Sequence, residues 1–200
     1  MNRRELLKLS AAAALGAPAV ASAQQACPTD GTPVQFVPKK VADANPLPKE
    51  LETYPKCPYC GMDRREHHRA RMLVQYSDDL TDGVCSIHCL AISLSLNIDR
   101  EPKNIWGTDY GSEADPRPLH PVDKLTYLIG ADLKHAMTKR SKHSFASKEV
   151  LEQFKTKHGG TPGNFDEALK QAYLDMAEDS RMIRKMREER RKHAEKAKQG

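Results

Sequence analysis

The sequence predicts an α+β protein made of two β-β-α-β units with a groove between them, followed by a long C-terminal helix. Three observations support this prediction. A strand, a second strand and a capped helix follow one another within residues 56–105, and the same order returns within residues 106–176. From Asp166 onward the apolar residues recur at helical spacing. Residues 177–200 then continue as a charged helical tail with few apolar positions.

Residues 1–23 have the pattern of a removable export signal. Arg3 and Arg4 precede an apolar run, and Ala21-Ser22-Ala23 offers the small side chains that signal peptidase requires. The paired arginines resemble a twin-arginine signal, and the run is shorter than the roughly 20 residues of a membrane span. We therefore predict a soluble, exported, periplasmic protein, in preference to a lipoprotein anchored at Cys27.

Residues 24–55 and the net charge of the mature chain say little about structure or partners. Residues 24–55 contain many prolines and little periodicity, which predicts an extended leader. Loss of the signal removes three cations and one anion, so the net charge falls from +5 to about +3. So small a charge gives no reason to expect nucleic acid as a partner.

The first unit is predicted from alternating and helical patterns. The mostly apolar segment Arg71–Tyr76 predicts a strand, and a second short strand is predicted through Val84 and Cys85. Ser86 is a suitable N-cap for a helix over Ile87–Leu96, and Asn97 is a suitable stop.

The second unit repeats this order. Strands are predicted at Lys124–Ile129 and His143–Ala146, with a loop over 130–141 between them, and Ser147 caps a helix over Lys148–Lys157. Val84-Cys85-Ser86 therefore corresponds to Phe145-Ala146-Ser147.

Residues 99–123, rich in proline and glycine, are expected to link the two units, with Trp106 and Tyr110 packing between them. His120, His135 and His143 are expected at the surface.

The charged tail contains nine Lys or Arg residues and three Glu residues between Arg181 and Gly200. Pairs such as Glu188 and Lys192 at i,i+4 favour a solvated helix. A tail kept for solubility is the plain interpretation, and docking to an acidic partner or to a membrane surface is the functional alternative.

Sulfur-containing residues are concentrated in two short segments of the first unit. Cys57, Cys60 and Met62 lie within six residues, and Cys85 and Cys89 are one helical turn apart. Thiolates and thioethers are soft ligands that select Cu(I), zinc or iron–sulfur clusters, so the pattern predicts a metal site. Disulfide bonds are the alternative, since exported proteins often pair their cysteines.

Several short motifs resemble the NosL family, the accessory proteins of nitrous oxide reductase. The motifs are Cys60-Gly61-Met62, Tyr127 to Asp132, Ala136-Met137-Thr138, Ser144-Phe145-Ala146 and Glu152 to Phe165. The resemblance covers about residues 50–176. The resemblance implies a periplasmic Cu(I)-binding protein that passes copper to a copper enzyme, with Cys60, Met62 and Met137 at the positions that match the family.

Cys85 and Cys89 depart from that pattern. Together with Cys60 they resemble the spacing of the TRASH and YHS metal-binding modules. Four thiolates would also suit a closed tetrahedral Zn(II) site. We therefore predict a site made of Cys57, Cys60, Met62, Cys85, Cys89 and Met137, with Cu(I) as the metal and Zn(II) as the alternative.

Three functions follow from these patterns. The first is a copper metallochaperone that serves a copper-dependent client enzyme or its assembly factors. The second is a binding module stabilised by zinc. The third is a thiol–disulfide oxidoreductase using Cys57 and Cys60, which is disfavoured because no helical pattern follows Cys60. A non-enzymatic role is predicted, since no catalytic relay accompanies the cysteines and histidines.

Overall fold

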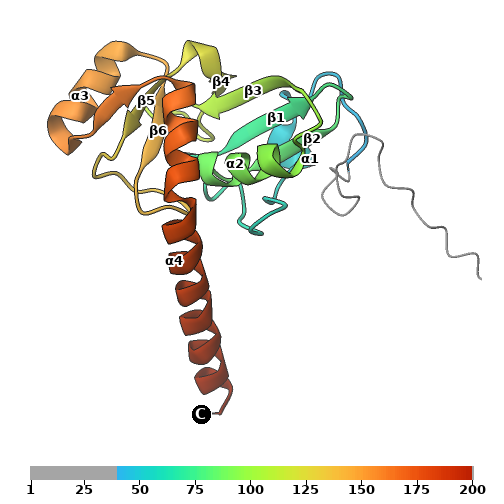
Figure 1. Cartoon of the computed structure of the whole chain (residues 1–200), viewed down its shortest axis with the longest axis vertical. Helices are drawn as coiled ribbons and strands as arrows, with labels where there is room; N and C mark the ends of the chain where they lie inside the picture. The colour runs from blue at the N-terminus through green and yellow to red at the C-terminus, as the bar shows by residue number, and fades with distance from the viewer. Residues whose placement is uncertain (1–39, 200) are drawn as a thin grey trace, which may run out of the picture.

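The computed structural model describes residues 40–199, so the predicted export signal and the first part of the leader lie outside the described residues. The elements, in chain order, are α1 (Glu50–Thr53), β1 (Met72–Tyr76), β2 (Thr81–Val84), α2 (Ile87–Leu96), β3 (Pro102–Thr108), β4 (Leu119–Pro121), the 3-10 helix η2 (Val122–Lys124), β5 (Thr126–Ile129), β6 (Lys142–Phe145), α3 (Lys148–His158), β7 (Thr161–Gly163) and α4 (Phe165–Gln199). The α+β class and the long C-terminal helix are confirmed (Figure 1).

The first unit is an antiparallel sheet in the order β2-β1-β3-β4, with α2 following β2. Met72 pairs with Val84, the last residue of β2, so Cys85 is the first residue beyond the sheet. Ser86 occupies the N-cap position of α2 in an extended conformation, and Asn97 ends the helix. The register of one strand pair therefore places Cys85 at the start of a helix.

The second unit repeats the β2-β1-β3 part of this arrangement, with β6-β5-β7 as a three-stranded antiparallel sheet and α3 after β6. Phe145, the last residue of β6, pairs with Thr126, and the Ser147 hydroxyl accepts a hydrogen bond from the Val150 backbone N–H. Phe145-Ala146-Ser147 thus takes the place of Val84-Cys85-Ser86, as the sequence predicts. The second unit has alanine where the first unit has Cys85.

Residues 99–123 differ from the expected linker. They contain β3 and β4. Strand β3 pairs with β1 between residues 102 and 107, and it crosses the boundary after residue 105 that was expected between the two units. Tyr110 does connect the units, since its backbone N–H donates to the Ser144 carbonyl at 2.7 Å. Trp106 instead packs with Tyr54 and Leu73 on the other side of the first sheet. The sequence did not reveal this strand because the segment is rich in proline and glycine, although Pro102 is only the first residue of β3, a position where proline is tolerated.

Helix α4 begins with a capping box, in which Asn164 and Glu167 each accept a hydrogen bond from the other's backbone N–H. Its first turns lie against both units, at the place where the groove was expected (Figure 1). Ala168 and Ala172 are buried there, because small side chains allow the helix to approach closely. Within residues 40–199, no helix is both long and apolar enough to cross a membrane.

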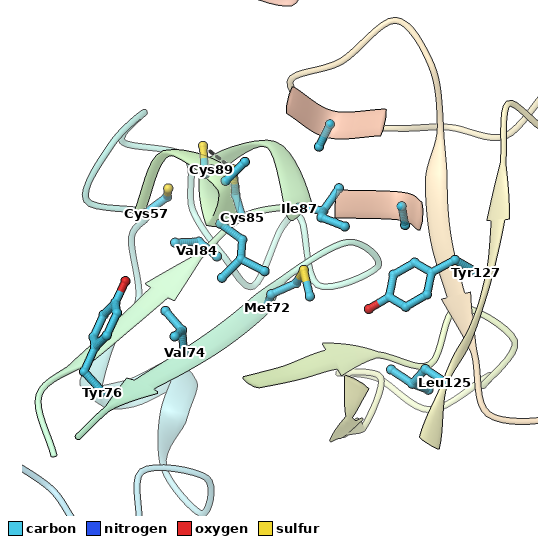
Figure 2. Close-up of a cluster of buried hydrophobic side chains, with 14 residues drawn as sticks. Cys57, Met72, Val74, Tyr76, Val84, Cys85, Ile87, Cys89, Leu125 and Tyr127 are labelled. Atoms are coloured by element: carbon cyan, nitrogen blue, oxygen red, sulfur yellow. Dashed lines mark hydrogen bonds between the residues drawn. The ribbon is translucent and has the colours of Figure 1, made fainter. Parts of the chain in front are cut away.

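One hydrophobic cluster crosses the boundary between the units. Figure 2 shows Cys57, Cys85 and Cys89 at one end of it and Leu125 and Tyr127 of the second unit at the other. The cysteines are therefore part of the core of the first unit rather than an appendage on its surface.

His143 is buried, contrary to the expectation from sequence, because it lies in β6 beneath the Tyr110 ring, with 4.1 Å between the ring centroids. Its Nε2–H donates to the Lys134 carbonyl oxygen at 2.9 Å. Burial lowers the pKa of His143 from 6.5 to about 4. The imidazole is therefore neutral in the folded protein at physiological pH.

His143 is expected to make the protein less stable in acid. Because its pKa is lower in the folded state, the unfolded chain binds the proton first as the pH falls below 6.5. The stabilisation is complete above pH 6.5, and about 2–3 kcal/mol of it should be lost by pH 4.5. Urea unfolding at pH 7 and pH 4.5 should show a smaller difference for His143→Gln than for the parent. His193→Gln, at an exposed position of α4, should leave the difference unchanged, and equal differences for all three proteins would contradict the assignment.

Candidate metal centre

A tight turn positions the first two cysteines. The Cys57 backbone N–H donates to the Met62 carbonyl, and the Gly61 N–H donates to the Cys57 carbonyl, both at 2.9 Å. Gly61 has φ +76°, a conformation that glycine adopts without steric cost. Lys56 and Asp63 form a β-bridge that closes the base of the turn. The chain thus reverses direction within a few residues.

The second pair comes from the end of β2 and the first turn of α2. The Sγ atoms of Cys85 and Cys89 are 3.6 Å apart, and those of Cys60 and Cys85 are 3.3 Å apart. The four Sγ atoms, including that of Cys57, all lie within 4.8 Å of one another. A tetrahedral thiolate centre with metal–sulfur bonds of about 2.3 Å needs sulfur atoms about 3.8 Å apart. The four thiols therefore fit around a single soft metal ion, and all four are free.

Access to the four sulfur atoms is uneven. Cys57, Cys85 and Cys89 are 2%, 0% and 0% exposed, whereas Cys60 is only partly buried. The centre is consequently closed on three sides and open at Cys60. A ligand of another molecule would approach the metal from this side.

The proximity of the thiols separates their pKa values. The pKa of Cys57 lies well below its ordinary value because of hydrogen bonding with Cys60, and then with Cys85 and Cys89. Contact with Cys57 raises the pKa of Cys60, but hydrogen bonds with Cys85 and Cys89 lower it overall. Contacts with Cys57 and Cys60, reinforced by burial, raise the pKa values of Cys85 and Cys89. Cys57 is therefore the thiol that ionises most readily, and metal binding releases the protons that the other thiols retain.

A buried polar chain holds the turn against α2. The Tyr59 hydroxyl donates to the Asp82 carboxylate, which also accepts from the Ser93 hydroxyl at 2.7 Å. Ser93 in turn lies 2.6 Å from the Tyr76 hydroxyl. Burial raises the pKa of Asp82. Tyr59, one of the two residues between Cys57 and Cys60, is thus fixed to the element that carries Cys89.

Arg64 connects the backbone segments next to both cysteine pairs. Its side chain is fully buried and donates to the Tyr54 carbonyl at 2.6 Å and the Val84 carbonyl at 3.3 Å. Tyr54 and Val84 lie just before Cys57 and Cys85 respectively. The Arg64 guanidinium also forms an ion pair with the Glu50 carboxylate at 2.7 Å. Arg64 therefore fixes the separation of the two segments that carry the thiols.

The two predicted methionines both contact the cluster that contains the cysteines. Met62 follows the turn, and Met137 comes from the 130–141 loop of the second unit. Both are partly buried. Met137 has φ +61°, an uncommon conformation for a residue with a side chain.

Asp179 of α4 connects the 130–141 loop, which carries Met137, to α2, which carries Cys89. One carboxylate oxygen accepts from the Lys139 N–H at 2.9 Å, and the other lies 3.3 Å from His88 Nδ1. Burial lowers the pKa of His88, although Asp179 opposes this effect. His88 therefore donates its Nδ1–H to Asp179 and, among residues 40–199, stands outside the group of side chains placed to hold one metal ion.

Sequence reasoning missed Arg64, Asp82 and Asp179. A weak signal existed for each of the last two. Asp82 is a charged residue within the buried strand β2, and Asp179 keeps helical phase with Ala168 and Ala172. Arg64 lies in a charged run that gives no indication of burial.

The fold and the centre define an α+β protein that presents four converging thiols to a soft metal ion. The NosL family model matches residues 48–173, so the chain belongs to the NosL family. The crystal structure of the copper chaperone NosL from Shewanella denitrificans is similar, with 20% identity over 64% of this chain and 96% of that chain and a TM-score of 0.47. Comparison with curated proteins found no match.

Proposed function

We propose that the protein is an exported accessory protein that binds Cu(I) at Cys57, Cys60, Cys85 and Cys89 and passes it to a copper-dependent client enzyme or its assembly factors. The observation that carries the proposal is the convergence of four thiols, of which, among residues 40–199, Cys60 alone is partly exposed. Membership of the NosL family supports copper as the cargo. The protein acts by binding and release, and no catalytic step is assigned to it.

The uneven burial of the four thiols provides a route for the release of Cu(I). Cu(I) is stable with two or three sulfur ligands, so a thiolate or thioether of a partner can replace Cys60 while the buried cysteines still hold the ion. Each exchange makes one copper–sulfur bond as another is broken. Met62 and Met137 are proposed to assist at the edge of the centre.

The thioethers provide the test between copper and zinc. Met62→Leu and Met137→Leu should each weaken Cu(I) binding about tenfold while changing Zn(II) binding less than about twofold, since zinc has little affinity for thioethers. Competition with a chromophoric Cu(I) chelator and with a Zn(II) chelator measures both affinities.

Met72→Leu is the matched control for these variants. Met72 belongs to the same cluster, but Figure 2 shows its sulfur beside Tyr127 rather than beside the cysteines. A Leu for Met exchange nearly conserves volume, so folding should be maintained in all three variants. Full Cu(I) affinity in both the Met62 and the Met137 variants would remove the thioethers from the proposed site.

A zinc-stabilised module is the second candidate, favoured by the four-thiol geometry itself, which suits a closed tetrahedral zinc centre. In that case the metal would hold the fold together and removal of zinc would unfold the first unit. The oxidoreductase alternative is weaker, because Cys57 and Cys60 lie in a turn and not at the start of a helix.

Export to the periplasm is proposed from residues 1–23 alone. Intact-mass measurement of the exported protein should give a chain that begins at Gln24. A mass that includes lipid on Cys27 would contradict the soluble form.

A further inference from the structure

The second half of α4 carries a row of basic side chains that the metal centre does not use. Every residue from Arg184 to Lys198 is exposed, and Figure 1 shows this part of the helix leaving the body of the protein. At 3.6 residues per turn, Arg184, Arg187, Arg191 and Lys198 lie within about 60° of one another around the helix axis. We call these four residues the basic face.

The acidic residues of the same segment lie outside the basic face. By the same helical geometry Glu188 and Glu195 lie along one border of its sector, and Glu189 lies well away from it. The ion pair on this stretch, Lys192 with Glu188 at 2.6 Å, is also off that face. Among residues 40–199, none of the four cations of the basic face forms an ion pair. Their charge is available to a partner.

The basic face is turned toward the metal centre. Arg187 Nη2 donates to the Cys60 carbonyl oxygen at 3.2 Å, so one cation of the face lies beside Cys60, the partly exposed member of the centre. The projecting part of α4 and the turn at Cys60 therefore lie next to each other. A partner protein bound along the basic face would contact the open side of the metal centre.

The composition of the helix identifies the kind of partner. A helix that lies in a membrane interface needs a continuous apolar face, but residues 184–198 contain only Met186, Ala194 and Ala197 as apolar residues. Arginine is the residue best suited to bidentate contact with carboxylates, and three of the four cations are arginines. An acidic protein surface matches this chemistry.

We propose that the basic face is a docking surface for an acidic protein that exchanges metal with the centre at Cys60. The proposal rests on the proposed function for the nature of the exchange, whereas docking itself requires only the charges. Electrostatic complementarity of this kind accelerates encounter and orients the partner before ligand exchange begins.

The test compares two triple variants of the full chain with equal net charge. Arg184→Gln/Arg191→Gln/Lys198→Gln neutralises three of the four cations of the basic face, and Arg181→Gln/Lys185→Gln/Lys196→Gln neutralises three cations that lie outside it. Arg187 is retained because it contacts the turn at Cys60. Glutamine is a good helix former, so far-UV circular dichroism should be unchanged in both variants.

The probe is fluorescently labelled poly-L-glutamate, with anionic phosphatidylglycerol vesicles as the comparison. The first variant should bind poly-L-glutamate about tenfold more weakly than the parent, and the second less than about threefold more weakly. In the parent loaded with Cu(I), the bound probe should also slow removal of copper by a chelator, because it covers the approach to Cys60.

Three outcomes would overturn the proposal: equal weakening in both variants, no binding of the probe by the parent, or binding of the vesicles without binding of the probe. Anisotropy measurements on metal-free protein test docking alone. Cu(I) affinity, which both variants should retain, tests the proposed function separately. Failure of one is thus distinguishable from failure of the other.

Discussion

Replacing Arg64 with methionine is expected to lower the free energy of unfolding by about 3–5 kcal/mol, because it leaves the buried Glu50 carboxylate without its closest cation. Arg71 would remain 2.8 Å from the other oxygen of Glu50, but the second oxygen would lose its ion pair. The carbonyls of Tyr54, Met72 and Val84 would also lose a donor. Chemical denaturation of the reduced, metal-free protein measures this loss.

Arg65→Met is the matched control, since Arg65 is the exposed neighbour of Arg64. It should change stability by less than about 0.5 kcal/mol. Arg64→Lys should fall between the two, because an ammonium group keeps the charge but cannot reach several carbonyls at once. If Arg64→Met were as stable as Arg65→Met, the buried network would have no part in holding the two cysteine segments together.

Replacing Cys85 with serine is expected to weaken Cu(I) binding by more than about 100-fold, the upper range for loss of a residue that only supports a ligand. The Sγ atom of Cys85 lies 3.3 Å from that of Cys60 and 3.6 Å from that of Cys89. Serine has nearly the same shape, but its hydroxyl is a hard and weakly acidic ligand that a soft ion rejects. Competition with a Cu(I) chelator measures the change.

Cys27→Ser is the control for this experiment, because Cys27 lies outside the two cysteine segments in the sequence. It should bind Cu(I) like the parent. A Cys85→Ser protein that keeps its Cu(I) affinity, or a Cys27→Ser protein that loses it, would show that the metal lies somewhere other than the four-thiol centre.

Local signals in the sequence were sufficient for much of the fold. Ser147 and Asn97 mark helix ends by their own chemistry, and their structural positions agree with that expectation. The duplicated order of strand, strand and capped helix could likewise be predicted, because each element depends on residues close to one another in the chain. The equivalence of Cys85 with Ala146 followed from that order.

Features that depend on distant residues could not be predicted in the same way. The strand β3 is formed by pairing with β1, and its own sequence, which begins with Pro102, gives a weak signal. His143 appeared to be a surface residue because the ring that covers it, Tyr110, is more than thirty positions away. Burial of an ordinary polar residue is determined by its tertiary partners rather than by its neighbours in sequence.

The candidate metal centre was likewise only partly predictable from the sequence. The spacing of the four cysteines predicted their convergence, since a short turn and one helical turn each bring two sulfur atoms together. The residues that hold the turn and the helix at the correct separation, Arg64 and Asp82, have no recognisable spacing. Asp179, which joins the Met137 loop to α2, lies about ninety positions from its partner His88.

Native mass spectrometry of the reduced full chain, offered equal amounts of Cu(I) and Zn(II), distinguishes a copper carrier from a structural zinc site. A copper carrier should bind one Cu(I) per chain in place of zinc, and a Cu(I) chelator should then remove the copper while far-UV circular dichroism remains that of the folded protein. Retention of one Zn(II) in the presence of Cu(I), with unfolding when the zinc is removed, would contradict a copper-carrying role and identify the four cysteines as a structural zinc centre.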